Sequence, residues 1–172
     1  QSRRPFIYYG EEIGLRGATQ LSGDARLRTP MSWNSDRLNA GFSSGTPFRS
    51  LAANAASTHV AQQEADPSSL LHFYRSVIAL RRALPALQSG HYLHPRASDS
   101  TLSFQRELDG QRVAVLFNYG NRASQIELSG LPYQAVFEQH WPTRADFISS
   151  DSGKLSLRLP AQSFVVLSSG PT

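Results

Sequence analysis

Hydrophobic residues change their spacing twice along this chain, and each change predicts a different kind of structure. Phe6–Tyr9 is a continuous apolar run of strand-forming residues, which is typical of a strand covered on both faces. Gly, Ser, Asn, Asp and Pro then dominate from Gly10 to about Ala65, and no helical period lasts longer than two turns. A loop of this length is unusual inside a compact domain unless it is functional or packs against another part of the protein.

The spacing becomes helical at Asp66. Asp66 and Pro67 predict a helix start, because Asp caps a helix well and Pro is tolerated at the first helical position. Pro85 predicts the end of the same helix. Its apolar residues form one broad stripe, as expected for a helix that lies on a sheet: Leu70, Tyr74, Val77, Leu80 and Leu84, widened by Leu71, Phe73 and Ile78.

From about Gly90 the pattern is that of β-strands. Asp109-Gly110 is a strong two-residue hairpin signal between two of them. Turn residues separate the predicted strands, which total about seven and suggest an antiparallel sandwich of about eighty residues. The residues that define them are Leu102 and Phe104; Val113 to Phe117; Ile126 and Leu128; Ala135 to Phe137; Leu155, Leu157 and Leu159; and Phe164 to Leu167.

The front third does not form a complete unit by this pattern. A single buried strand, a long loop and one helix leave the strand without neighbours, and a lone strand cannot satisfy its edges or cover its faces. We therefore predict that residues 1–87 are the end of a larger barrel and that residues 88–172 are a separate β-sandwich domain.

Composition and charge exclude several classes of protein. The 172 residues are 40% hydrophobic and 17% charged, which is typical of a packed globular chain. The net charge is +4, but the basic residues are scattered and form no run with interleaved aromatics, so we predict no nucleic-acid partner. The absence of cysteine excludes disulfides and thiolate metal sites. We read no signal peptide and no membrane span, and the sequence assigns no cellular location.

Four motifs resemble the α-amylase family of glycoside hydrolases, above all its α-glucosidase and trehalose-synthase-like branches. They are "PFIYYGEEIGL" at Pro5–Leu15, "RTPMSW" at Arg28–Trp33, "NAGF" at Asn39–Phe42 and "DPSSLLHFYRSVIALRR" at Asp66–Arg82. Their order and spacing carry the resemblance over about residues 5–90. The family fold is a (β/α)8 barrel followed by a β-sandwich called domain C.

The resemblance implies a mixed fold made of the last β/α unit of the barrel and the sandwich. It places Phe6–Tyr9 at barrel strand eight, Gly10–Ala65 in the loop that follows, Asp66–Leu84 at the last barrel helix and the remainder in domain C.

The resemblance also implies the chemistry of the parent enzyme. In a retaining glycosidase one carboxylate attacks the anomeric carbon, and a second, about 5 Å away, protonates the leaving oxygen. In this family these carboxylates and a supporting Asp come from strands four, five and seven, so we expect no catalytic residue in this chain. The parent is then an enzyme acting on α-glucosidic bonds, whereas the 172-residue chain alone is expected to be inactive. Its expected partners are an α-glucan or α-glucoside and the remainder of the barrel; no cofactor or metal is identifiable, and calcium is possible in the missing part of the parent.

Arg28 is the candidate substrate-binding residue. The resemblance implies that the arginine of the Arg-Thr-Pro-Met motif reaches the glucose at the reacting subsite, which favours action at a chain end. A guanidinium fork suits sugar hydroxyls and a neighbouring carboxylate. The alternative is that Arg28 pins the loop through backbone carbonyls. Trp33 and Phe42 leave a similar choice between stacking on sugar faces and packing the loop.

The other polar candidates are weaker. Glu11 and Glu12 are adjacent, so on extended chain they point to opposite sides and cannot flank one glycosidic bond; solvent or arginine is expected to hold them. Asp24 fits a turn cap equally well. His91 and His94 are three residues apart in extended chain and should face opposite sides, which argues against a metal site.

A second function remains open at this point: a non-catalytic β-sandwich module that binds carbohydrate or supports a partner structurally. The expected lack of catalytic carboxylates favours it. The match of residues 6–65 to barrel loops argues against it, as does Trp141 being the only tryptophan in the sandwich.

Overall fold

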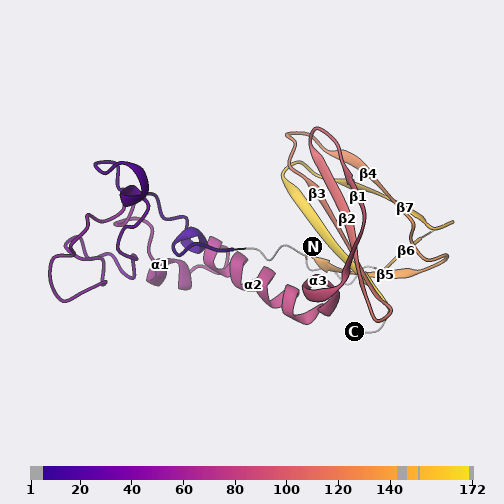
Figure 1. The fold of residues 1–172 in the computed structure, drawn as a ribbon, viewed down its shortest axis with the longest axis horizontal. Helices are drawn as coiled ribbons and strands as arrows, with labels where there is room; N and C mark the ends of the chain where they lie inside the picture. The colour runs from indigo at the N-terminus through magenta and orange to yellow at the C-terminus, as the bar shows by residue number, and fades with distance from the viewer. Residues whose placement is uncertain (1–5, 143–146, 151, 171–172) are drawn as a thin grey trace. The chain divides into compact units, whose positions relative to one another are not determined.

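The computed structural model describes residues 6–142, 147–150 and 152–170, and these fall into two compact units. The N-terminal unit ends at Ile78 and the C-terminal unit begins at Ala79, so the division lies within a helix (Figure 1).

The N-terminal unit is built mainly of loops. Its regular elements are two 3-10 turns, η1 (Glu11–Ile13) and η2 (Gly23–Arg26), the short helix α1 (Val60–Glu64) and the first part of α2 (Leu70–Ala83). Gln63 ties them together from a buried position: its amide nitrogen donates to the carbonyl oxygen of Ile13 at 2.7 Å, and its amide oxygen accepts from the backbone N–H of Leu71 at 3.0 Å. One side chain therefore links the start of the long loop to the helix that follows it.

The strand predicted at Phe6–Tyr9 is not formed. Residues 6–8 have no regular structure and Tyr9 lies in a turn, with Phe6 85% exposed. A strand requires a neighbour to take its backbone hydrogen bonds, and none of the described residues pairs with this segment. The apolar run is therefore present without the sheet that its composition predicts.

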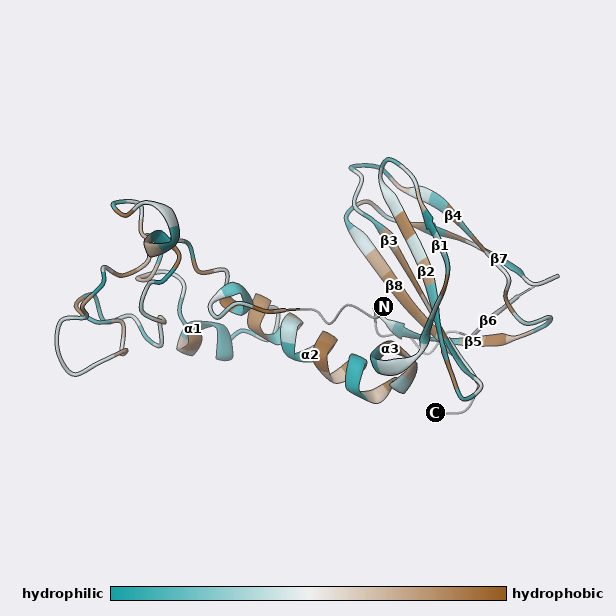
Figure 2. Ribbon diagram, viewed as in Figure 1, coloured by the Kyte–Doolittle hydropathy of each residue, from teal (hydrophilic) through white to brown (hydrophobic). Residues whose placement is uncertain are grey.

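The predicted amphipathic helix is confirmed as α2, although it starts at Leu70 rather than Pro67. Asp66 caps a turn before the helix, because its carboxylate accepts from both the backbone N–H and the hydroxyl of Ser68. The Ser69 hydroxyl then accepts from the N–H of His72 at 3.4 Å, with the three-residue spacing of an N-cap. Figure 2 shows hydrophobic and hydrophilic residues alternating along α2.

The C-terminal unit is the antiparallel sandwich that the sequence predicts, preceded by the end of α2 and by the short helix α3 (Pro85–Ser89). A six-stranded sheet has the order β1-β2-β3-β8-β5-β6, and β4 pairs with β7 in a second sheet (Figure 1). The strands are β1 (His91–Ala97), β2 (Thr101–Leu108), β3 (Gln111–Asn118), β4 (Ser124–Ser129), β5 (Val136–Trp141), β6 (Phe147–Ser149), β7 (Lys154–Leu159) and β8 (Ser163–Ser169).

The predicted hairpin at Asp109-Gly110 joins β2 to β3. Both residues have positive φ, 48° and 84°, as a tight two-residue turn between twisted strands requires. The pairing Leu108↔Gln111 closes the hairpin directly at the turn.

Two apolar clusters cover the two faces of the large sheet. The inner cluster lies between the sheets and includes Ala114 and Leu116 of β3. The outer cluster includes Val113 and Val115 of the same strand, covered by buried residues from Leu84 and α3. β3 is therefore buried on both faces, which explains its continuous apolar run.

Candidate functional site

The three residues singled out in the long loop, Arg28, Trp33 and Phe42, line one hollow of about 530 Å³ in the N-terminal unit. It is open to solvent, and most of its wall is apolar or aromatic. The lining residues are Tyr9, Glu12, Arg28, Thr29, Pro30, Met31, Trp33, Phe42, Pro47, Phe48 and Arg49. The sequence motifs did not indicate Phe48 and Arg49, which lie side by side with the Arg49 guanidinium 5.8 Å from the centre of the Phe48 ring.

The "NAGF" motif forms the turn that brings Trp33 and Phe42 to the same hollow. The N–H of Trp33 donates to the carbonyl oxygen of Ala40 at 2.8 Å, and the Asn39 side chain accepts from the N–H of Gly41 at 2.8 Å. Gly41 has φ 71°, and a Cβ there would lie 2.6 Å from the side-chain nitrogen of Asn34. Only glycine fits this position without displacing a neighbour.

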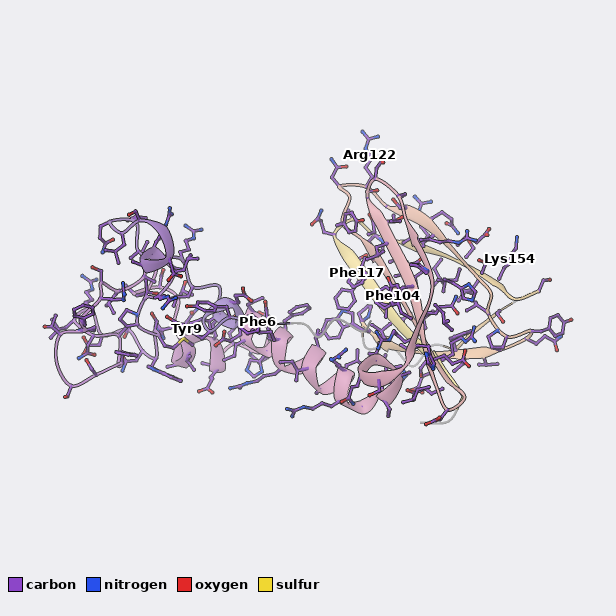
Figure 3. All side chains as sticks on the ribbon, in the orientation of Figure 1. Phe6, Tyr9, Phe104, Phe117, Arg122 and Lys154 are labelled. Atoms are coloured by element: carbon purple, nitrogen blue, oxygen red, sulfur yellow. The ribbon has the colours of Figure 1, made fainter. Side chains whose placement is uncertain are left out.

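Tyr9, labelled in Figure 3, holds the Arg28 segment through a hydrogen bond, and both residues line the hollow. Its hydroxyl donates to the carbonyl oxygen of Thr29 at 2.9 Å across a partly buried contact. Tyr9 is 44% exposed as a residue, and its hydrogen bond to Thr29 is partly buried. This burial, followed by the contact with Tyr8, raises the pKa of Tyr9, while Arg28 and Arg49 act in the opposite direction.

Arg28 pairs with a carboxylate rather than with a backbone carbonyl among the described residues. Its guanidinium lies 2.6 Å from the Asp24 carboxylate one helical turn earlier, with both side chains more than half exposed. The turn at Asp24 is closed by its backbone carbonyl, which accepts from Leu27, so the side chain of Asp24 is free to meet Arg28. An exposed pair of this kind contributes little stability and can open when a ligand competes for the guanidinium.

Glu11 and Glu12 face different hollows, although they lie in the 3-10 turn η1 and not on the extended chain that the prediction assumed. Glu11 accepts from the N–H of Tyr8 at 3.3 Å and lines a smaller hollow with Asp24. Glu12 lines the hollow of Arg28, and one of its carboxylate oxygens is buried without a hydrogen-bond partner among the described residues. These two carboxylates therefore do not flank a common point.

The histidines of the described residues form no metal centre, because no group of three or more potential ligands occurs among them. His59 has a local role instead, since its ring nitrogen Nδ1 accepts from the N–H of Gln62 at the start of α1. Among the same residues, no helix has the length and apolar character needed to cross a bilayer.

The hollow offers apolar faces and hydrogen-bond donors side by side. Aromatic faces such as that of Trp33 can pack against C–H groups. The guanidinium groups of Arg28 and Arg49 can donate to hydroxyl oxygens. A sugar presents both kinds of surface.

Comparison with known proteins identifies the family. The profile described as "Alpha amylase, catalytic domain" matches residues 2–90, slightly more than half of the chain. The chain therefore belongs to the α-amylase family, and the predicted resemblance is confirmed.

Individual relatives agree with this assignment. A Rhizobium meliloti protein named "Probable alpha-glucosidase" is 36% identical over 138 residues, covering 71% of this chain and 25% of the relative. The α-amylase SusG of Bacteroides thetaiotaomicron is 30% identical over 174 residues, covering 96% of this chain and 24% of the relative. The crystal structure of the isomaltulose synthase SmuA from Protaminobacter rubrum superposes with a TM-score of 0.64 at 26% identity, covering 85% of this chain and 26% of that one. The chain spans about a quarter of the length of these relatives.

Proposed function

We propose that this chain is the C-terminal portion of a retaining glycoside hydrolase or transglycosylase that acts on α-glucosidic bonds of malto-oligosaccharides or related α-glucosides. Residues outside this chain supply its catalytic carboxylates, and the 172-residue chain alone does not turn over substrate. Arg28 contributes to substrate binding. The observation that carries the proposal is the hollow in which Arg28, Trp33 and Phe42 meet, within a chain of this family.

The structure supports a binding role for Arg28 through its surroundings. The guanidinium is exposed and held by a single exposed carboxylate, so it can exchange Asp24 for a ligand at small cost. Tyr9 fixes the backbone immediately after it through Thr29. A guanidinium group held in this way can form charge-assisted hydrogen bonds to sugar hydroxyls.

The first test joins this chain to the upstream part of SusG, because the similarity to that relative spans 96% of this chain. We expect the chimera to release sugars from maltoheptaose, and the 172-residue chain of 19.0 kDa, verified by intact mass, to release none. Turnover by the 172-residue chain alone would contradict the placement of the catalytic carboxylates outside it.

Arg28→Ala in the chimera tests the residue itself. We expect kcat/KM to fall by about tenfold to a hundredfold, the value of one hydrogen bond to a charged group. Arg122→Ala is the matched control, because Arg122 is an exposed arginine of the turn between β3 and β4. If Arg28→Ala and Arg122→Ala lowered kcat/KM equally, Arg28 would not belong to the substrate site.

A further inference from the structure

Glu12 carries a carboxylate whose charge the described residues do not compensate. One of its oxygens is buried and accepts no hydrogen bond from these residues. The same side chain lines the hollow of Arg28. A carboxylate that is shielded from water on one side is costly unless donors or a positive charge surround it. The wall of the candidate site therefore holds an acceptor for which this part of the chain supplies no donor.

The two arginines that line the hollow do not pair with Glu12. The guanidinium of Arg28 lies 2.6 Å from the Asp24 carboxylate, and that of Arg49 lies 5.8 Å from the centre of the Phe48 ring. In the described part of the chain no ion pair joins Glu12 to either arginine. Two groups of donors and one acceptor therefore line the same space without satisfying one another.

The turn η1 holds the backbone of Glu12 in place. The N–H of Gly14 donates to the carbonyl oxygen of Glu11 at 3.0 Å and closes the turn. Ile13, the next residue after Glu12, is 1% exposed, and its carbonyl oxygen accepts from the buried side chain of Gln63 at 2.7 Å. Because its backbone is anchored, Glu12 can meet a ligand in the hollow with little reorganisation.

The charged residues that line the hollow favour a neutral ligand with hydroxyl groups. Asp24 neutralises Arg28, so Arg49 and Glu12 leave one charge of each sign around the hollow. The arginines repel a cation and Glu12 repels an anion, whereas a hydroxyl donates one hydrogen bond and accepts others. Two hydroxyls of one sugar can therefore satisfy Glu12 and an arginine together.

We propose that Glu12 determines specificity: its carboxylate accepts a hydrogen bond from one hydroxyl of the sugar in the hollow, while Arg28 donates to the same sugar. The proposal rests on the proposed function, which places an α-glucoside there. A sugar that lacks this hydroxyl is strongly disfavoured, because it displaces water from the carboxylate without giving a donor in return. Glu12 thus recognises one hydroxyl and takes no part in bond cleavage.

Substrates that each lack one hydroxyl test this role in the SusG chimera. The probes are p-nitrophenyl α-maltoside and its monodeoxy analogues. In the unsubstituted chimera, removal of the hydroxyl that Glu12 contacts should lower kcat/KM by about tenfold to a hundredfold. In Glu12→Ala the same removal should lower kcat/KM by less than about threefold, because the acceptor is already gone. A purely structural role of Glu12 would lower kcat/KM for all substrates alike, and unchanged ratios at every position would overturn the proposal.

Two further variants complete this comparison. Glu12→Gln preserves the size of the side chain and one oxygen acceptor but removes the charge, so its discrimination should lie between those of the unsubstituted chimera and Glu12→Ala. Glu11→Ala is the matched control, because Glu11 lies in the same turn and lines the other hollow. It should leave the ratios between substrates unchanged. Loss of the same ratio in Glu11→Ala would overturn the assignment to Glu12.

Binding separates this proposal from the proposed function. If the chimera has no turnover, calorimetric titration with the same maltosides gives dissociation constants in place of kcat/KM. A chimera that lacks turnover, but whose binding ratio collapses in Glu12→Ala, would contradict the proposed function alone. Turnover with ratios that do not depend on Glu12 would overturn the specificity proposal alone, and absence of both turnover and binding would overturn both.

Discussion

The hydroxyl of Tyr9 donates to the carbonyl oxygen of Thr29, twenty residues later, at 2.9 Å and so joins two sequence motifs. Tyr9 belongs to the "PFIYYGEEIGL" motif and Thr29 to the "RTPMSW" motif. The bond fixes the backbone next to Arg28 at the wall of the hollow. The two motifs therefore act together in building the candidate site.

This bond should make the site sensitive to alkaline pH. The pKa of Tyr9 is raised above its ordinary value of 10.0, chiefly by partial burial of the hydroxyl. A tyrosine with a raised pKa contributes stability that is fully present below about pH 10 and is lost as the pH rises through the folded-state pKa. We expect hydrogen-exchange protection around Thr29 to decline over that range in the native chain, and to be lower and flat in Tyr9→Phe. A flat profile in both proteins would show that the hydroxyl does not hold the segment.

A second prediction concerns Gly90, which lies between α3 and β1. A Cβ at this position would lie 2.6 Å from the carbonyl oxygen of Ala86 and 2.7 Å from that of Glu107, and backbone atoms cannot move aside easily. Gly90→Ala should therefore destabilise the C-terminal unit by about 1–3 kcal/mol, the usual cost of overpacking. Urea unfolding followed by circular dichroism measures the effect.

Gly45→Ala is the control for this change, because a Cβ at Gly45 meets no atom within 4 Å. It should leave the unfolding midpoint within experimental error. If Gly90→Ala also leaves the unfolding midpoint unchanged, that result would contradict the close packing of α3 on β2 at this point.

The parts of the fold that the sequence predicts well are those set by neighbouring residues. Asp109-Gly110 predicts its hairpin because the turn itself requires positive φ at both positions. The strand at Phe6–Tyr9 fails for the opposite reason, since a strand forms only beside another strand and that condition is not local. The start of α2 is displaced because Ser68 engages Asp66 in a turn before the helix begins.

Some residues of the candidate site could likewise be predicted from the sequence, and others could not. Arg28, Trp33 and Phe42 could be selected from the sequence because they belong to recognisable motifs. Phe48 and Arg49 could not, because they reach the hollow from a loop without periodicity or motif, although Phe48 is 98% exposed. An aromatic residue next to an arginine in a long polar loop is the weak signal in the sequence that could have drawn attention to them.

Asp24→Asn should make Arg28 more available to a sugar. The pair is exposed, so its loss should change the free energy of unfolding by less than about 0.5 kcal/mol. If Asp24 competes with the ligand for Arg28, calorimetric titration of Asp24→Asn with maltose should give a dissociation constant a few-fold lower than that of the native chain. Weaker binding would mean instead that Asp24 positions the guanidinium for the sugar.

Glu64→Gln provides the control for this substitution. Glu64 pairs with Arg75 at 2.9 Å with similar exposure, but neither residue lines the hollow. It should alter neither stability beyond about 0.5 kcal/mol nor maltose binding. A matching change in binding would reveal a general effect of charge rather than competition for Arg28.

Leu116→Ala should separate the stability of the sandwich from that of the rest of the chain. Leu116 is fully buried in the inner cluster between the two sheets, so truncation leaves a cavity and should cost about 2–5 kcal/mol. The same substitution at the exposed Leu38 should cost less than about 0.5 kcal/mol. Because the chain forms two compact units, only the transition of the C-terminal unit should move to lower urea concentration. Hydrogen exchange during unfolding distinguishes the transitions of the two units. If Leu116→Ala lost as much protection around Gln63 as in the sandwich, the units would unfold as one.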